Sequence, residues 1–242
     1  MPSWNVHTAH VQRLLREGAP AAFGVRDANA FLFGNLLPDL YVGYMVPDPT
    51  KILDYRITHV AEGTSIPVPR EREFWDTYVV PTRPVRDGVP DRERAERLLG
   101  VPGYRASDVT LGAWAHILCD SCYNAATRAW ISKYHVPTGE KTRIRKQDDF
   151  DKFGRTLPVS LTCDYTEDLV SQAHDFPQYE VAAPDVKSAV TLVNGIVEVN
   201  LVDHLDATPD YSLLTEDFFH NVFEHVNECL YERLRAYGES LA

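Results

Sequence analysis

Apolar residues recur every three to four positions over most of this 242-residue chain, and this period restricts the fold more than any other feature. We expect helices over 4–18, 27–37, 91–100, 108–132, 148–157, 162–174, 185–204 and from 215 towards the end of the chain. Asp27, Ser107 or Asp108, and Thr215 precede three of these segments as N-caps. Pro38 is expected to stop the second helix. The pattern therefore predicts an all-α fold.

The sequence pattern changes in the region between Val46 and Val109, where eight prolines favour loops and short helical turns over long helices. No repeat, low-complexity tract or long linker divides the chain. We therefore expect one multi-helix domain over residues 1–242, with residues 64–107 as an irregular, proline-rich excursion.

Charge and composition exclude several function classes. Lys and Arg number 24 and Asp and Glu number 35, and the resulting charge of −11 argues against a nucleic-acid partner. No apolar run is long enough to predict a transmembrane segment. Four cysteines are too few for a disulfide scaffold, and the pattern of the first residues does not predict a secretory signal. We expect a cytoplasmic protein with reduced thiols.

The strongest chemical signal lies in the segment 111–120, where His116 and Asp120 are four residues apart. This spacing puts an imidazole and a carboxylate on one face of a helix, where both can bind one Zn²⁺. The alternative is a core histidine that is hydrogen-bonded to an aspartate one turn away. Gly112 lies on the same face and leaves room for a neighbouring backbone.

Three further residues have side chains that suit a metal site. His7 lies on the apolar face of the first helix, Asp39 follows Leu37-Pro38, and His59 ends a short apolar stretch. Each residue taken alone fits a structural role. The other histidines, His10 among them, are expected at surface or capping positions.

The order of these motifs resembles that of the zinc-dependent phospholipase C family, which shares its helical fold with the P1-type nucleases. The similar segments are 4–8, 31–39, 57–59, 115–120 and, less closely, 149–153. The resemblance implies that Asp39, His59, His116 and Asp120 enclose one zinc ion. It also implies that His7 approaches a second metal, which Asp120 bridges to the first. We expect one or two Zn²⁺ per chain.

The chain departs from the family pattern at three places. The family's secreted members bind metal through the free amine of an N-terminal tryptophan, whereas removal of Met1 would leave the amine of Pro2 here. Ala126 replaces a family histidine, and no His-x-x-x-Glu pair lies between Asp120 and Leu157. Asp149 is a further candidate for a later ligand.

The resulting hypothesis is a phosphoesterase that hydrolyses a phosphodiester or phosphomonoester with metal-activated water. Asp39 and Asp120 would hold and orient the metal, and Trp75, Tyr78 and other residues of the proline-rich excursion would wall the pocket. The substrate is either a small phosphoester or a phospholipid headgroup. The basic run 141–146 is either a solvated edge or a surface that attracts an anion.

Two alternatives belong to other classes. The first is a non-catalytic helical domain that a closed zinc site or a His–Asp network holds together. A weaker alternative is a hydrolase that uses Cys163 or Cys229 with a remote histidine. The oligomeric state does not follow from the sequence.

Overall fold

The structure is a computed structural model that describes residues 2–63 and 65–241. Within these ranges it contains eleven α-helices and no strand, so the all-α prediction is confirmed. The helices are α1 (Trp4–Glu17), α2 (Ala28–Gly34), α3 (Leu37–Leu40), α4 (Tyr55–Thr58), α5 (Glu71–Phe74), α6 (Arg92–Leu99), α7 (Asp108–Lys133), α8 (Glu140–Thr156), α9 (Glu167–His174), α10 (Ala183–Val202) and α11 (Glu216–Ser240). A 3₁₀ turn (Pro20–Phe23) and a π-helical turn (Trp75–Val79) complete the set.

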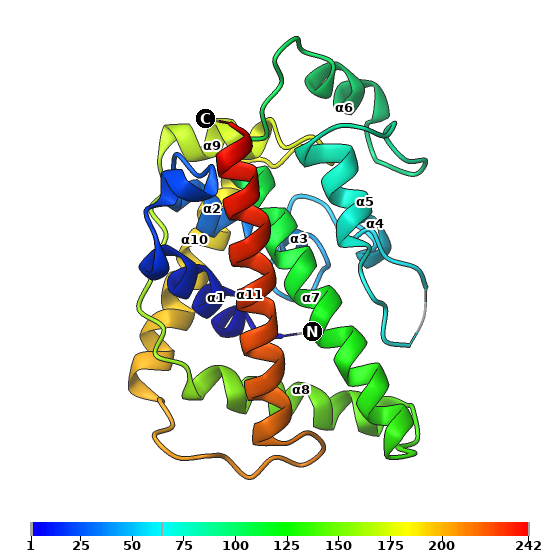
Figure 1. Cartoon of the computed structure of the whole chain (residues 1–242), viewed down its shortest axis with the longest axis vertical. Coiled ribbons are helices and arrows are strands. Elements are labelled where there is room, and N and C mark those ends of the chain that lie inside the picture. Colours follow the sequence, from blue (N-terminus) through cyan, green and yellow to red (C-terminus); the bar gives the residue numbers. More distant parts are fainter. Residues whose placement is uncertain (1, 64, 242) are drawn as a thin grey trace.

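Helix α7 is the axis of the fold (Figure 1). Helices α2 and α11 pack against it, and α1 packs in turn against α8, α10 and α11. One cluster of buried apolar side chains extends from Trp4 in α1 to Tyr237 in α11. Polar side chains that α1 and α7 direct inward therefore meet in the interior.

The first half of α7 has no solvent-exposed face. Every residue from Asp108 to Asp120 is buried, and Ser107 caps the helix by accepting a hydrogen bond from the N–H of Thr110. Because neighbouring elements surround this half, the polar side chains of His116 and Asp120 lie in the core. Such groups are stable there only when they have partners.

Two glycines allow α2 and α7 to cross in backbone contact. A Cβ atom added to Gly112 would lie 2.1 Å from the carbonyl oxygen of Phe31, and one added to Gly34 would lie 2.1 Å from that of Val109. Only hydrogen fits in either place. The room that we expected at Gly112 is therefore filled by the backbone of α2.

The predicted helix over 27–37 is two helices. Asp27 caps α2 as expected, but α2 ends at Gly34, and Pro38 lies in the first turn of α3 instead of stopping a helix. A proline is tolerated there because the first N–H groups of a helix have no partner within it. Asp39 is thereby placed inside α3.

Helix α8 begins eight residues earlier than we predicted, at Glu140 rather than at 148. Its first half has few apolar residues, so the periodicity did not show it. Ion pairs such as Arg143–Glu140 and Lys152–Asp148 lie along its exposed face. The basic run 141–146 is therefore helical.

The excursion over 64–107 contains short helices joined by loops, in agreement with the prediction for this region. Helix α6 begins after the N-cap Asp91 and ends at Gly100. Trp75 packs edge-to-face on Trp114 of α7, with ring centroids 4.7 Å apart, which attaches the excursion to the core.

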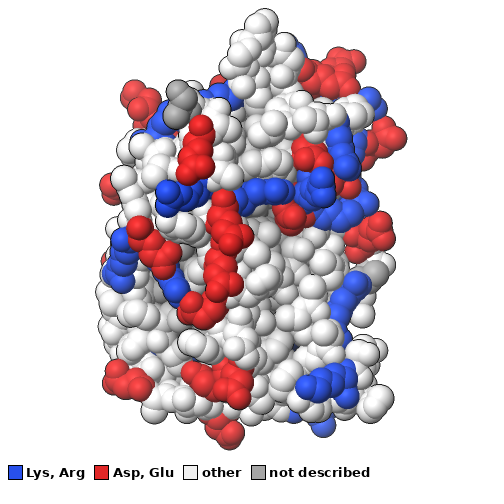
Figure 2. Space-filling view, viewed as in Figure 1, with Lys and Arg blue, Asp and Glu red and all other residues white. Residues whose placement is uncertain are grey.

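Acidic and basic side chains are mixed on the face that Figure 2 shows, and the acidic ones form a band down its middle. None of the described helices is long and apolar enough to cross a membrane.

Candidate metal centre

Five side chains from four segments meet at one point beside α7. His7 comes from α1, Asp39 from α3, His59 directly follows α4, and His116 and Asp120 come from α7. Each of the five is at most 1 % exposed. The structure therefore brings together all five residues that the sequence analysis selected.

The donor atoms of Asp39, His59, His116 and Asp120 lie close together. The Nε2 atom of His59 lies 3.4 Å from Oδ1 of Asp39 and 3.5 Å from Oδ2 of Asp120. The Nε2 atom of His116 lies 3.1 Å from that of His59, 3.9 Å from Oδ2 of Asp39 and 4.0 Å from Oδ2 of Asp120. Ligand atoms around a tetrahedral Zn²⁺ are about 3.3 Å apart, given bonds of about 2.0–2.1 Å. The separations among His59, His116 and Asp120, 3.1–4.0 Å, are close to this value, and these three residues could hold one small cation.

Hydrogen bonds behind two of the imidazoles aim their Nε2 atoms at this point. Nδ1 of His116 lies 2.8 Å from the carbonyl oxygen of Asn35, and Nδ1 of His59 lies 2.8 Å from Oγ1 of Thr58. A carbonyl only accepts, so Nδ1 of His116 carries the proton and its Nε2 presents a lone pair. Metal-binding histidines are oriented in this way.

The pKa shifts agree with this protonation. Burial lowers the pKa of His116 to about 3, and the nearby His7 acts in the same direction. Burial by itself would raise the pKa of Asp39 and Asp120, but the neighbouring imidazoles outweigh it and lower both. At neutral pH the centre therefore combines a neutral His116 with two carboxylates.

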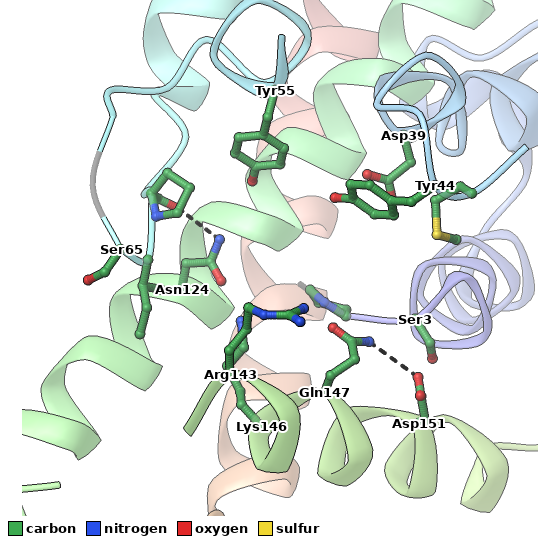
Figure 3. Close-up of a pocket in the computed structure, with 14 residues that line it drawn as sticks. Ser3, Asp39, Tyr44, Tyr55, Ser65, Asn124, Arg143, Lys146, Gln147 and Asp151 are labelled. Atoms are coloured by element: carbon green, nitrogen blue, oxygen red, sulfur yellow. Dashed lines mark hydrogen bonds between the residues drawn. The ribbon is translucent and has the colours of Figure 1, made fainter. Parts of the chain in front are cut away.

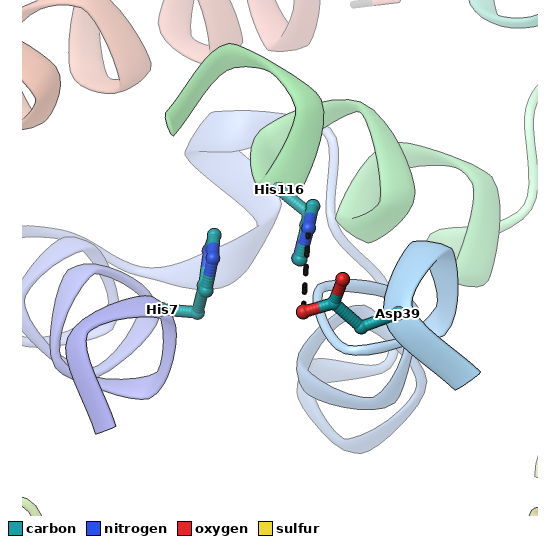
Figure 4. Close-up of side chains that lie close together, drawn as sticks. All are labelled: His7, Asp39 and His116. Atoms are coloured by element: carbon teal, nitrogen blue, oxygen red, sulfur yellow. Dashed lines mark ion pairs between the residues drawn. The ribbon is translucent and has the colours of Figure 1, made fainter. Parts of the chain in front are cut away.

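His7 lies at the edge of this group. Its Nε2 atom is 3.5 Å from Oδ1 of Asp120, and its ring stacks on that of His116 with centroids 3.9 Å apart. Figure 4 shows the two parallel rings with Asp39 below them. Donor atoms of His7, Asp39 and His116 all lie within 4.8 Å of one another, and those of His59, His116 and Asp120 form a second such set. Two adjacent cations would therefore share ligands.

Several polar atoms of the centre have no hydrogen-bond partner among residues 2–63 and 65–241. They are both ring nitrogens of His7, Oδ1 of Asp39 and Oδ1 of Asp120. Leaving a buried polar atom without a partner costs about 1–3 kcal/mol, and more for a charged group. A cation at this point would satisfy the carboxylates and the imidazole lone pairs together.

Two side chains that the sequence analysis did not select support the carboxylates. Nε1 of Trp4 donates a hydrogen bond to Oδ2 of Asp39 at 3.2 Å, and the hydroxyl of Tyr55 donates one to Oδ2 of Asp120 at 2.9 Å. Tyr55 also stacks on His59, four residues later, with centroids 3.8 Å apart. That spacing is the signal by which Tyr55 could have been found.

A cavity of about 470 Å³ leads from the surface to Asp39 and Tyr55. Figure 3 shows α8 on one side of it, with Asp39, Tyr44 and Tyr55 opposite. The expectation that Trp75 and Tyr78 wall this pocket is wrong, because both rings pack in the core. The excursion contributes Ser65, Ile66 and Pro67 instead, and Asn124 of α7 donates a hydrogen bond to the carbonyl of Pro67.

Asp149 has a structural role instead of the ligand role that we considered. Its carboxylate accepts hydrogen bonds at 2.7–2.8 Å from the backbone N–H groups of Ser212, Leu213 and Leu214, and so anchors the segment before α11. His10 was expected at the surface but is buried, with Nδ1 2.8 Å from Oδ1 of Asn227.

The chain matches no protein-family model, no curated protein and no solved structure.

Proposed function

We propose that this protein is a metal-dependent phosphoesterase with one or two Zn²⁺ beside α7. The observation that carries the proposal is the convergence of carboxylate oxygens and imidazole nitrogens, several of which have no hydrogen-bond partner among the described residues, beside a cavity that Asp39 lines. The order of the sequence motifs, which resembles that of the zinc-dependent phospholipases C, supports a phosphoester as the substrate.

Asp39, His59, His116 and Asp120 would hold the first zinc ion, and His7 would approach a second that shares Asp120. Bound zinc would supply a Lewis acid and lower the pKa of water towards about 7. The centre is buried on all other sides, so a substrate would reach it through the cavity that Asp39 lines.

Neighbouring residues of the chain would hold the candidate metal ligands in position. Trp4 donates to Oδ2 of Asp39 and Tyr55 donates to Oδ2 of Asp120, and these hydrogen bonds would fix the orientation of both carboxylates. Asn35 and Thr58 fix the two imidazole rings. A site held in this way loses little free energy to reorganisation during the reaction.

The second candidate is a structural metal site without activity, and the complete burial of all five ligand side chains favours it. The two functions differ in what a chelator does. A structural zinc stabilises the fold outright, so its removal unfolds the protein. Removal of a catalytic zinc would abolish turnover while the circular dichroism spectrum stays helical.

The test is elemental analysis of protein purified without a histidine tag, for wild type, His116→Ala, Asp120→Asn and the exposed control His220→Ala. We expect one or two zinc ions in wild type and control, and a loss of zinc in the other two. Release of nitrophenol from mono- and bis-(nitrophenyl) phosphate should follow the zinc content. A wild type that binds no metal after reconstitution at neutral pH would overturn the proposal.

A further inference from the structure

Lys146 is a buried cation on the wall of the cavity. It is 9 % exposed and comes from α8, on the side opposite Asp39 and Tyr55 (Figure 3). Its Nζ atom lies 5.9 Å from the ring centroid of Phe150 and has no hydrogen-bond or ion-pair partner within the described part of the chain. Lys146 therefore presents an ammonium group without a counter-ion to the cavity, which offers a place for an anion.

Arg143 adds a second cation on the same side of the cavity. It precedes Lys146 by three residues in α8, so the two side chains share one face of the helix. Glu140 accepts hydrogen bonds from Nε and Nη2 of Arg143 at the exposed edge of α8. Because a guanidinium has five N–H donors, Arg143 can bind Glu140 and still reach a ligand.

The remaining groups of this wall do not compete with an anion for Lys146. Gln147 donates a hydrogen bond to Asp151, the carboxyl group that α8 contributes to the cavity. Burial raises the pKa of Asp151, which disfavours its charged form. Lys146 and Arg143 thus place two cations in a cavity of an acidic chain, on the side opposite the carboxylate of Asp39.

We infer that Lys146, with Arg143, forms a phosphate-binding subsite that makes the cavity specific for phosphomonoesters; this inference rests on the proposed phosphoesterase function. A phosphomonoester carries about two negative charges at neutral pH and three terminal oxygens. Its charge and its three terminal oxygens suit a cavity that is lined both by Asp39 of the metal centre and by the α8 cations. A diester has one charge and a second substituent in place of the third terminal oxygen. A headgroup with a cationic end would be repelled by Lys146.

The test is calorimetric binding of inorganic phosphate to zinc-loaded and to zinc-free protein. The variants are Lys146→Met, Lys146→Arg and Arg143→Gln, with Lys141→Met as the control because Lys141 is an exposed lysine of the same helix. Lys146→Met should weaken phosphate binding by at least about tenfold, which is the loss expected for one charge-assisted hydrogen bond. Lys146→Arg should retain part of the affinity, Arg143→Gln should have a smaller effect, and Lys141→Met should have none.

Measuring both the zinc-loaded and the zinc-free protein tests the phosphate subsite independently of the proposed phosphoesterase function. A chain that holds no zinc would contradict the phosphoesterase, but a drop in phosphate affinity on Lys146→Met would still support the subsite. Equal phosphate binding by wild type and Lys146→Met, in both forms, would overturn it. In the active form, Lys146→Met should lower kcat/KM for the monoester more than for the diester. A loss by the same factor for both substrates would overturn the monoester specificity.

Discussion

The Nε2 atoms of His59 and His116 face each other at 3.1 Å inside the core. A direct hydrogen bond would need a proton on Nε2 of His59, because the carbonyl of Asn35 already takes the N–H of His116. Nε2 of His7 lies 3.5 Å from Oδ1 of Asp120 and can share a proton with it, but Nδ1 of His7 and Oδ1 of Asp39 would still have no hydrogen-bond partner among the described residues. A His–Asp network therefore satisfies only part of this cluster, whereas a shared cation satisfies its carboxylates and lone pairs together.

Tyr55→Phe should weaken zinc binding by about 10- to 100-fold, since this is the usual effect of removing a group that orients a metal ligand. The substitution removes the hydroxyl that donates to Asp120 and keeps the ring that stacks on His59. Competition with a fluorescent zinc chelator measures the affinity. Tyr104→Phe is the matched control, because its hydroxyl donates to the carbonyl of Tyr78, outside the centre. Equal affinities for the two variants would contradict a supporting role for Tyr55.

His10 should make the stability of the zinc-free protein sensitive to acid. Burial lowers the pKa of His10 from 6.5 to about 3, and Arg13 acts in the same direction while Glu224 opposes it. The unfolded chain therefore binds more protons than the folded one between these values. The contribution of buried, neutral His10 to the free energy of unfolding is complete above pH 6.5. It decreases as the pH falls towards 3, by at most about 1.4 kcal/mol per pH unit.

Urea unfolding at a series of pH values checks this prediction. His10→Gln removes the titrating group, so its free energy of unfolding should fall less steeply with acid than that of wild type. His220→Gln changes an exposed histidine and should keep the wild-type slope. If His10→Gln also keeps that slope, His10 is not the source of the acid sensitivity.

Asp149→Ala should lower the free energy of unfolding by on the order of 3 kcal/mol without changing the zinc content, because it leaves three backbone N–H groups without their charged acceptor. The neighbouring Asp148 is exposed and pairs with Lys152, so Asp148→Ala should cost less than about 1 kcal/mol. Denaturant unfolding and elemental analysis of both variants give the two quantities. A loss of zinc on Asp149→Ala would return this residue to the list of ligands.

Gly112→Ala should destabilise the fold by about 3 kcal/mol or more, since the added methyl group must separate α2 from α7. The shift would also move the carbonyl of Asn35 away from His116, so zinc affinity should fall with stability. Gly195→Ala in α10 is the control. Its Cβ meets nothing within 4 Å, and alanine is favoured over glycine in a helix by about 1 kcal/mol. Thermal melts should therefore shift in opposite directions.

Periodicity and capping were sufficient to predict the helices of this chain where the buried face is apolar. Helices α7 and α11 begin at the predicted residues because Ser107 and Thr215 cap them, and α1 was predicted from its apolar stripe, which is also a local feature. The start of α8 was missed because exposed ion pairs stabilise that stretch and leave no apolar period. The break between α2 and α3 was missed because a proline fits the first turn of a new helix as well as it ends an old one.

The residue types and their order along the chain were enough to select His7, Asp39, His59, His116 and Asp120 as candidate ligands. Only His116 and Asp120 could be placed together from spacing, because they share one helix. The meeting of all five depends on how α1, α3, α4 and α7 pack, and on the contact at Gly34 and Gly112 that brings Asn35 to His116. The burial and the contacts of Lys146, Asp149 and His10 likewise depend on the tertiary structure. Burial, and which polar group faces which, arise between segments that are distant in the sequence, so no local pattern carries them.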